Sequence, residues 1–197
     1  MQGLTQFIIE IKEPYTDKKK LKGGASIFID KRFSHFESAS RRAVVVNTPL
    51  KHKTPIKKGD TLFIDPSILM QEIFRGVKND SPYIVDSTKG WYRIDASLIL
   101  AYYSEDKKEW IGYGNNSLMQ PIKTQAKEKI GSLFIPESSK DKYEKQRATA
   151  SIINTTLMEQ GVKKGDTVVL HPQATLSYEF QGDTYWHVRN KDALAIV

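Results

Sequence analysis

Short apolar runs recur along the whole chain, and most are bounded by Gly, Pro, Asp or Asn. In the first half these runs are Phe7–Ile11, Ala43–Val46, Thr61–Ile64, Tyr83–Val85 and Trp91–Ile94. In the second half they are Ser117–Ile122, Thr149–Ile153, Thr167–Leu170, Thr175–Phe180 and Tyr185–Val188. β-Branched and aromatic residues dominate runs of this length, which predicts strands. Helical periodicity is scarce, and its best candidate, residues 139–146, is so densely charged that we interpret it as a loop. The pattern predicts an all-β protein.

The two halves repeat the same blocks in the same order. The clearest pair is Ile56–Pro66 against Val162–Pro172, which align without a gap around a shared Lys-Lys-Gly-Asp. Three weaker pairs flank it, namely Gly24–Ile29 with Gly131–Ile135, Val44–Thr48 with Ser151–Thr155, and Leu100–Tyr102 with Leu194–Ile196. The preserved order predicts two tandem copies. Strands this short close most easily into small barrels, because closure removes exposed sheet edges.

The shared Lys-Lys-Gly-Asp block predicts the same tight turn in both copies. Gly59 and Gly165 can supply the positive φ that such a turn needs. Asp60 and Asp166, the residues that follow, can accept hydrogen bonds from their own backbone. We expect the two turns to have the same geometry.

The composition of the chain suggests where the copies begin and end. We place the first at residues 1–104, a linker at 105–115 and the second at 116–197. The linker is inferred from the charged stretch Ser104–Glu109, and Trp110 and Tyr113 are expected to dock it against a barrel. The first copy carries extra residues within Ser67–Trp91, and insertions of this kind lie in surface loops.

Net charge and cysteine content narrow the function classes. The chain of 197 residues has 30 Lys and Arg against 23 Asp and Glu, a net charge of +7. A basic balance raises nucleic acid as a partner. However, the charge is spread along the chain, and we interpret its densest cluster, Lys18–Lys22, as a solvated loop. Cysteine is absent, which excludes a disulfide scaffold, a thiolate zinc site and a cysteine nucleophile.

The motifs that an enzyme or a membrane protein would need are missing from the sequence. None of the four His has a partner at metal-binding spacing. Gly112-Tyr113-Gly114 begins like a dinucleotide loop but lacks the third glycine. No apolar run approaches the roughly 20 residues needed to cross a bilayer. The first six residues do not resemble a secretory signal. We expect a cytoplasmic protein that is not an enzyme and has neither a metal nor a membrane partner.

A long charged segment separates the first two predicted strands of each copy. These segments are Lys12–Arg42 and Lys123–Arg147, and each contains one apolar triplet, Ile27-Phe28-Ile29 or Leu133-Phe134-Ile135. An exposed apolar triplet in a charged loop is a candidate docking peptide that becomes ordered when it binds a groove. The local sequence leaves a second interpretation open, in which both triplets are edge strands packed on their own core.

The order of these features resembles the GroES-like co-chaperonin family. In the second copy, Leu118–Lys123 is similar to the family's first strand, Gly131–Pro136 to its mobile loop and Val162–Leu170 to its central strand. The Ala-Ile-Val ending is also close to the family's. The resemblance covers nearly the whole chain, in a layout similar to the double-domain co-chaperonin of chloroplasts. It implies two tandem small GroES-like β-barrels.

The resemblance also implies a function, namely a lid without catalysis that caps a chaperonin ring and assists protein folding. Its docking residues would be Ile27, Phe28, Ile29, Leu133, Phe134 and Ile135. Gly23, Gly24 and Gly131 would give the loops their turns, and the insert within Ser67–Trp91 would stand at the family's roof hairpin. The partners would be a GroEL-like chaperonin ring and further copies of this chain in a ring. The chaperonin would use the ATP, and this chain would need no cofactor.

Two other functions stay open at this stage. A repurposed GroES-like barrel could act as a structural or virion assembly module, which predicts that both triplets pack within the barrel. A basic barrel could instead bind RNA or DNA, which predicts steep salt dependence. That function also predicts exposed aromatic side chains, with Tyr102, Tyr103, Trp110 and Tyr113 as candidates. We regard nucleic acid as an unlikely partner, because the sequence has no concentrated basic arm.

Overall fold

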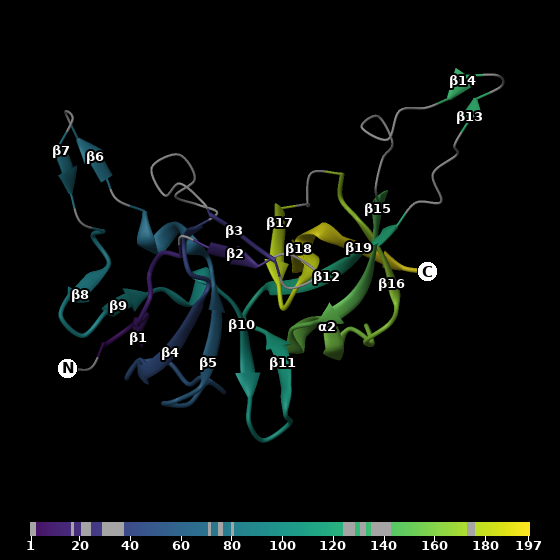
Figure 1. Cartoon of the computed structure of the whole chain (residues 1–197). Coiled ribbons are helices and arrows are strands. Elements are labelled where there is room, and N and C mark those ends of the chain that lie inside the picture. The colour runs from purple at the N-terminus through teal and green to yellow at the C-terminus, as the bar shows by residue number, and fades with distance from the viewer. Residues whose placement is uncertain are drawn as a thin grey trace. The chain divides into compact units, whose positions relative to one another are not determined.

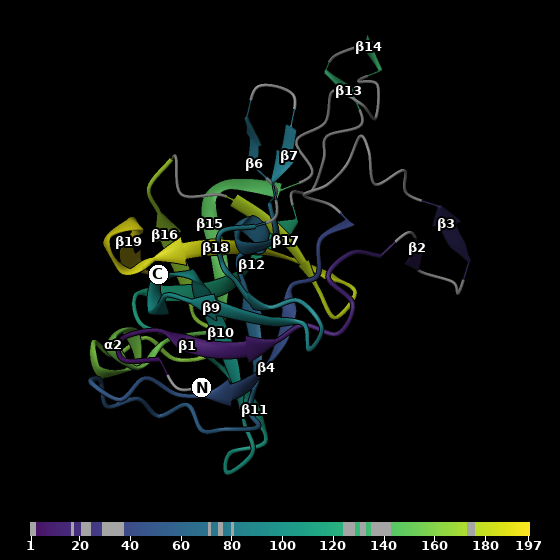
Figure 2. The same ribbon diagram turned by 90° about the vertical axis from the view of Figure 1, so that its left-hand side faces the viewer.

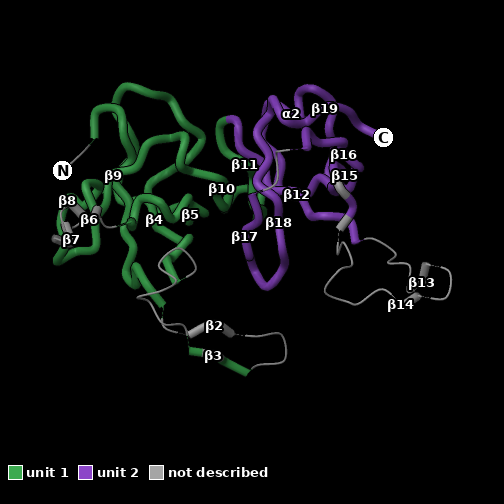
Figure 3. Tube along the Cα trace, turned by 90° about the horizontal axis from the view of Figure 1, so that it is seen from above, with its two compact units in different colours: residues 1–114 green, residues 115–197 purple. Residues whose placement is uncertain are grey.

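Antiparallel strands provide almost all of the regular structure in the computed structural model of the chain (Figure 1). The structure describes residues 3–16, 18–20, 25–28, 38–70, 72–74, 77–79, 81–123, 129–130, 133–134, 143–172 and 176–197. The chain divides into two units, Met1–Gly114 (unit 1) and Asn115–Val197 (unit 2), which Figure 3 colours separately. The all-β fold class is confirmed.

Unit 1 is built on a seven-stranded antiparallel sheet with the order β11-β10-β5-β4-β1-β9-β8. Its strands are β1 (Phe7–Glu10), β4 (Arg42–Asn47), β5 (Thr61–Ile64), β8 (Ile84–Asp86), β9 (Trp91–Ile94), β10 (Ile99–Ser104) and β11 (Glu109–Gly112). The neighbours β1 and β9 can be followed in Figure 2. Two short 3₁₀ helices, η1 (Pro66–Leu69) and η2 (Ala96–Leu98), follow β5 and β9 respectively. Two hairpins form small sheets of their own, β2 (Lys18–Lys20) with β3 (Ser26–Phe28) and β6 (Glu72–Phe74) with β7 (Val77–Asn79).

Unit 2 is built on a six-stranded antiparallel sheet with the order β17-β18-β12-β15-β16-β19. Its strands are β12 (Asn116–Lys123), β15 (Tyr143–Ile152), β16 (Thr167–Leu170), β17 (Leu176–Phe180), β18 (Asp183–Arg189) and β19 (Ala193–Ile196). A five-residue helix, α2 (Thr155–Glu159), follows β15, and the 3₁₀ helix η4 (Asn190–Asp192) precedes β19. The hairpin of β13 (Lys129–Ile130) and β14 (Leu133–Phe134) forms a separate two-stranded sheet.

The two sheets have the same strand order. Followed from β8, unit 1 runs β8-β9-β1-β4-β5-β10, and unit 2 matches it strand for strand as β17-β18-β12-β15-β16-β19. The register also agrees at the last pair, where Leu62 lies opposite Tyr102 in unit 1 and Val168 lies opposite Ile196 in unit 2. Both units shift register at the same step between their first two strands. The expected alignment of Leu100–Tyr102 with Leu194–Ile196 is therefore confirmed.

The predicted Lys-Lys-Gly-Asp turns are present and have the same geometry. Gly59 has φ +93° and Gly165 has φ +94°. The carboxylate of Asp60 accepts from the backbone N–H of Lys57 at 2.7 Å, and Asp166 accepts from Lys163 at 2.8 Å. The two turns confirm the geometry expected from the repeated block.

One sequence match between the copies is wrong. Asn47 lies in β4 opposite Ile8, whereas Asn154 is the N-cap of α2. The backbone instead makes Val45 equivalent to Ala150. Each of these residues donates its N–H to the carbonyl of the turn aspartate, at 2.9 and 2.8 Å, and accepts from the turn glycine at 2.8 Å. An Asn-Thr pair is too short to fix an alignment when one copy uses it to start a helix.

The stretch expected as a linker, residues 105–115, differs from that expectation. Residues 105–108 form a turn, and β11 then pairs with β10 inside the sheet of unit 1. The ring of Trp110 meets that of Tyr103 edge to face at 5.7 Å, and Tyr113 meets Phe7 at 6.1 Å. The charged turn made β11 difficult to predict, because this strand is stabilised by hydrogen bonds to β10 and not by a pattern in its own sequence. Likewise, residues 143–146, which we expected in a loop, belong to β15.

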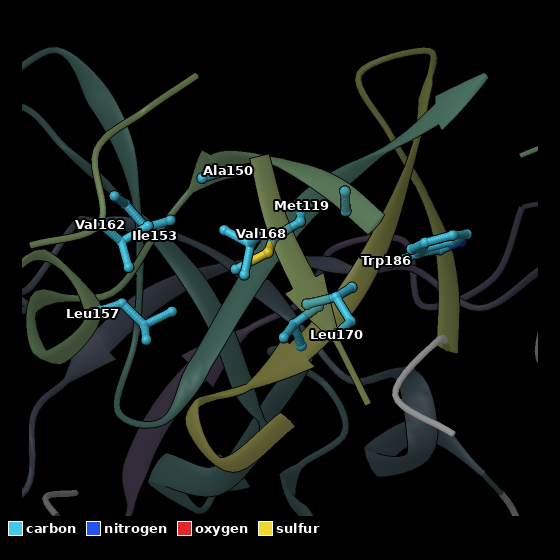
Figure 4. Close-up of a cluster of buried hydrophobic side chains, with 10 residues drawn as sticks. Met119, Ala150, Ile153, Leu157, Val162, Val168, Leu170 and Trp186 are labelled. Carbon is cyan, nitrogen blue, oxygen red and sulfur yellow. The ribbon is translucent and has the colours of Figure 1, made fainter. Parts of the chain in front are cut away.

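Each unit has an apolar core between its strands. In unit 2 a cluster of ten buried side chains includes Met119, Leu157, Val168, Leu170 and Trp186 (Figure 4). Fully burying a large apolar side chain contributes roughly 1.5–3 kcal/mol. The cluster packs β12, β15, β16, β18 and α2 together. It therefore fixes β12 and β15, the two strands between which the β13–β14 hairpin lies in the chain.

Candidate functional site

The first candidate site is the hairpin β2–β3, which follows β1 in the chain and precedes β4. Its register places Lys18 opposite Phe28, Lys19 opposite Ile27 and Lys20 opposite Ser26. Among the described strands, the hairpin is a two-stranded sheet of its own, separate from the seven-stranded sheet. The side chain of Phe28 is 78% exposed, the largest value among the described large apolar residues. The structure therefore contradicts the packed-edge interpretation for Phe28.

The second candidate site is the hairpin β13–β14, in the equivalent place between β12 and β15. Lys129 lies opposite Phe134, and Ile130 lies opposite Leu133. Like the first hairpin, it forms a sheet of its own. The structure thus places one hairpin with a phenylalanine between the first two strands of each unit.

Several predicted site residues lie outside the described residues. These are Gly23, Gly24, Ile29, Gly131 and Ile135. Ile27, Leu133 and Phe134 are described as strand residues of β3 and β14. A docking role for the two triplets remains a prediction at this point.

Backbone hydrogen bonds between residues 14–16 and 38–40 join the two ends of the segment that carries the β2–β3 hairpin. Tyr15 forms an isolated bridge with Ala39, the N–H of Thr16 donates to the carbonyl of Ser38 at 2.8 Å, and that of Ser40 donates to Pro14 at 2.8 Å. The hydroxyl of Tyr15 donates to the carbonyl of Leu69, and burial raises the pKa of this phenol. The loop thus leaves unit 1 from a fixed base.

A groove of about 520 Å³ lies beside this base and is lined by residues of β1, β4 and β5 together with Ile11, Lys12, Glu13, Thr16 and Ser40. The charged side chains among its described lining residues are Glu10, Lys12, Glu13 and Arg42. Lys12 and Glu10 approach each other at 3.8 Å.

The described residues contain no cluster of three or more acidic or histidine side chains that could hold a metal ion. Of the histidines described, His52 and His171 are exposed, while Nε2 of His187 is 2.9 Å from Oδ1 of Asn116. No helix within the described part of the chain is long and apolar enough to span a membrane.

The aromatic residues considered for nucleic-acid binding do not form an exposed surface. Tyr102 is 7% exposed, and its ring meets that of Tyr113 edge to face at 6.1 Å. Tyr103, Trp110 and Tyr113 are partly buried. These rings pack against other rings of unit 1, and none of the four is in the exposed class.

The match to a known protein family covers the C-terminal unit. The family described as Chaperonin 10 Kd subunit matches residues 113–197. Co-chaperonin GroES of Coprothermobacter proteolyticus is 30% identical over 89 residues, which cover 43% of this chain and 90% of that protein. The chain belongs to the chaperonin 10 kDa subunit family. Co-chaperonin GroES of Deinococcus radiodurans is 28% identical over 89 residues, covering 43% of this chain and 94% of that protein.

Membership of the chaperonin 10 kDa subunit family confirms the resemblance noted from the sequence. The matched region contains β12 to β19 and therefore the β13–β14 hairpin. It includes all of unit 2. Unit 1 shares the strand order of this family region but lies outside the match.

Proposed function

We propose that this protein is a co-chaperonin that caps a chaperonin ring through its two hairpins and thereby assists protein folding. The observation that carries the proposal is the exposure of Phe28, at 78%, on a hairpin separate from the main sheet. The family match of unit 2, which has a hairpin in the equivalent place, supports the same role.

Docking would follow from the burial of the apolar triplets. Ile27, Phe28 and Ile29, with Leu133, Phe134 and Ile135, would enter an apolar cleft of the chaperonin. Each fully buried large side chain contributes roughly 1.5–3 kcal/mol, less the cost of ordering the loop. One hairpin is then a weak ligand. Several hairpins held together become a strong one, because binding of the first raises the effective concentration of the rest.

The remaining parts of the proposal follow from the family. Unit 1 would be a second, divergent barrel of the same kind, and the shared strand order and turn geometry support this. The chaperonin would bind and hydrolyse ATP, while this chain would act in the cytoplasm without a cofactor or catalysis. Membranes and nucleic acids would not be partners.

Ring assembly is the part of the proposal that concerns copies of this chain. In unit 1, β11 covers the outer edge of β10. The strand of unit 2 that corresponds to β10 is β19, and it is the last strand of its sheet among the described strands. The side chains of Leu194, Ile196 and Val197 are 57%, 47% and 71% exposed. An edge strand with exposed apolar side chains favours pairing with another chain. We expect further copies to assemble through this edge.

Capture of a chaperonin ring tests the proposal. The full-length chain is mixed with a purified bacterial chaperonin and ADP, and the complex is separated by size exclusion. We expect wild-type protein to be captured, and Phe28→Asp/Phe134→Asp to lose at least about tenfold in affinity, because two charged side chains replace two buried phenyl rings.

The control replaces exposed apolar residues outside the hairpins. Leu50 and Leu176 are 60% and 51% exposed, one in each unit. Leu50→Asp/Leu176→Asp should be captured like wild type. Equal capture of the Phe variant would reject hairpin docking. No capture of the wild-type chain would favour a barrel that serves assembly alone.

A further inference from the structure

The two hairpins share a cross-strand pair. Lys18 lies opposite Phe28 in β2–β3, and Lys129 lies opposite Phe134 in β13–β14. Residues directly opposite each other in an antiparallel pair belong to the same face, with Cβ atoms about 4.5–5.5 Å apart. Each hairpin therefore has a lysine and a phenylalanine at adjacent positions of one face.

The pair recurs although the two hairpins differ in length. β2 and β3 are joined by residues 21–25, whereas β13 and β14 are joined by residues 131–132 only. A different turn length changes which residue stands opposite the phenylalanine. All three residues of β2 are lysines, so every register of the first hairpin places a lysine opposite Phe28. In the second hairpin β13 holds Lys129 and Ile130, and the lysine is the one that lies opposite the phenylalanine.

We propose that the Lys–Phe pair is a two-part docking element, an inference that rests on the proposed function. The phenyl ring enters the apolar cleft of the chaperonin, and the lysine ammonium pairs with a carboxylate on the rim of that cleft. A lysine suits this position because its aliphatic stem can lie along apolar surface while the charge stays in water. The partner site is therefore an apolar cleft with an acidic rim.

A charge at the rim of the cleft contributes mainly to the rate and the orientation with which the hairpin binds. Opposite charges around an apolar contact steer the encounter and fix its orientation, and this contribution falls with ionic strength. In the first hairpin Lys19 and Lys20 adjoin Lys18 in β2, so its local positive charge is greater than that of β13. The first hairpin should be the more salt-sensitive of the two.

Nucleic acid is the other macromolecule that a basic hairpin could bind. Proteins that bind single strands stack successive bases on several aromatic side chains along a basic groove. Within the described residues of the two hairpins, Phe28 and Phe134 are the aromatic ones, one in each. The observations favour a protein cleft.

The experiment measures the affinity of the full-length chain for a purified bacterial chaperonin ring with ADP, at about 50 mM and about 500 mM salt. Exposed ion pairs contribute about 0.2–1 kcal/mol each, so Lys18→Gln/Lys129→Gln, which removes two of them, should bind roughly two- to thirtyfold more weakly at the lower salt. At the higher salt it should match wild type.

Two further variants identify the cause of that loss. Lys18→Arg/Lys129→Arg keeps the charge and should bind like wild type. Lys51 in unit 1 and Lys163 in unit 2 are exposed and lie outside the hairpins. Lys51→Gln/Lys163→Gln removes the same charge from the molecule and should also bind like wild type.

The outcomes separate this inference from the proposed function. If Lys18→Gln/Lys129→Gln binds like wild type at low salt while Phe28→Asp/Phe134→Asp is not captured, the lysine role is overturned and the proposed function stands. Absence of wild-type capture at both salts would overturn both. If the Gln variant keeps capture but loses binding to a labelled single-stranded oligonucleotide, the lysines serve nucleic acid and the inference is overturned.

Discussion

Asn154 shows how one buried amide can organise the end of a β-unit. Its side chain is fully buried, and Oδ1 accepts from the backbone N–H of Leu157 at 3.0 Å, which caps α2. Its Nδ2 donates to Oγ of Ser117 at 3.0 Å and to Oδ1 of Asn190 at 2.6 Å. A single residue thus ties β12, α2 and η4 together.

We expect Asn154→Ala to destabilise unit 2 by about 2–4 kcal/mol, because it removes a helix cap and leaves buried polar groups without partners. Urea titration followed by hydrogen exchange of residues 116–197 measures the change. Thr156→Ala, an exposed change in the same helix, should cost less than about 0.5 kcal/mol. A loss for Asn154→Ala no larger than for the control would contradict this role.

The sequence predicted which residues are of functional interest better than it predicted which residues contact each other. The apolar triplets stand out because they interrupt charged segments, and Phe28 is indeed exposed. The lysine opposite each phenylalanine could not be found in this way. Its position depends on where the hairpin turns, and the two hairpins turn over different lengths. Asn154 was missed as a cap because a five-residue helix shows no periodicity.

At the scale of elements, the repeated Lys-Lys-Gly-Asp turn is the strongest link between the units. An added Cβ at Gly59 or Gly165 would meet no atom within 4 Å, so crowding does not demand glycine there. The positive φ does, because residues with a Cβ are strained in that region. The backbone conformation therefore explains why both turns carry the same residue.

We expect Gly59→Ala and Gly165→Ala each to cost about 1–2 kcal/mol, through backbone strain alone. Hydrogen exchange should show the loss in unit 1 for the first variant and in unit 2 for the second. The two variants are controls for each other, because equivalent turns should lose similar amounts of unfolding free energy. A large cost in one unit and none in the other would contradict the equivalence.

Three of the strands bounded by turn residues were predicted to the residue. Thr61–Ile64, Trp91–Ile94 and Thr167–Leu170 have the predicted limits. β11 was mistaken for part of a linker because it follows a charged turn and its pairing with β10 leaves no mark in the local sequence. Local patterns predict which residues can form a strand, whereas the partner strand decides which ones do.

At the scale of the whole molecule, two units with one strand order are present, and the family match covers the C-terminal one. The order of the repeated blocks predicted two sheets with the same strand order, and the structure has them. The main difference between the units is at the last strand, where β11 covers β10 while β19 ends its sheet.

The central claim is that both hairpins enter a chaperonin. Hydrogen exchange of the full-length chain, measured with and without a purified chaperonin ring and ADP, tests it most directly. The account predicts that protection rises in residues 18–28 and 129–134 on binding, while the core strands β5 and β16 change little. Binding that protects other surfaces and leaves both hairpins unchanged would contradict it.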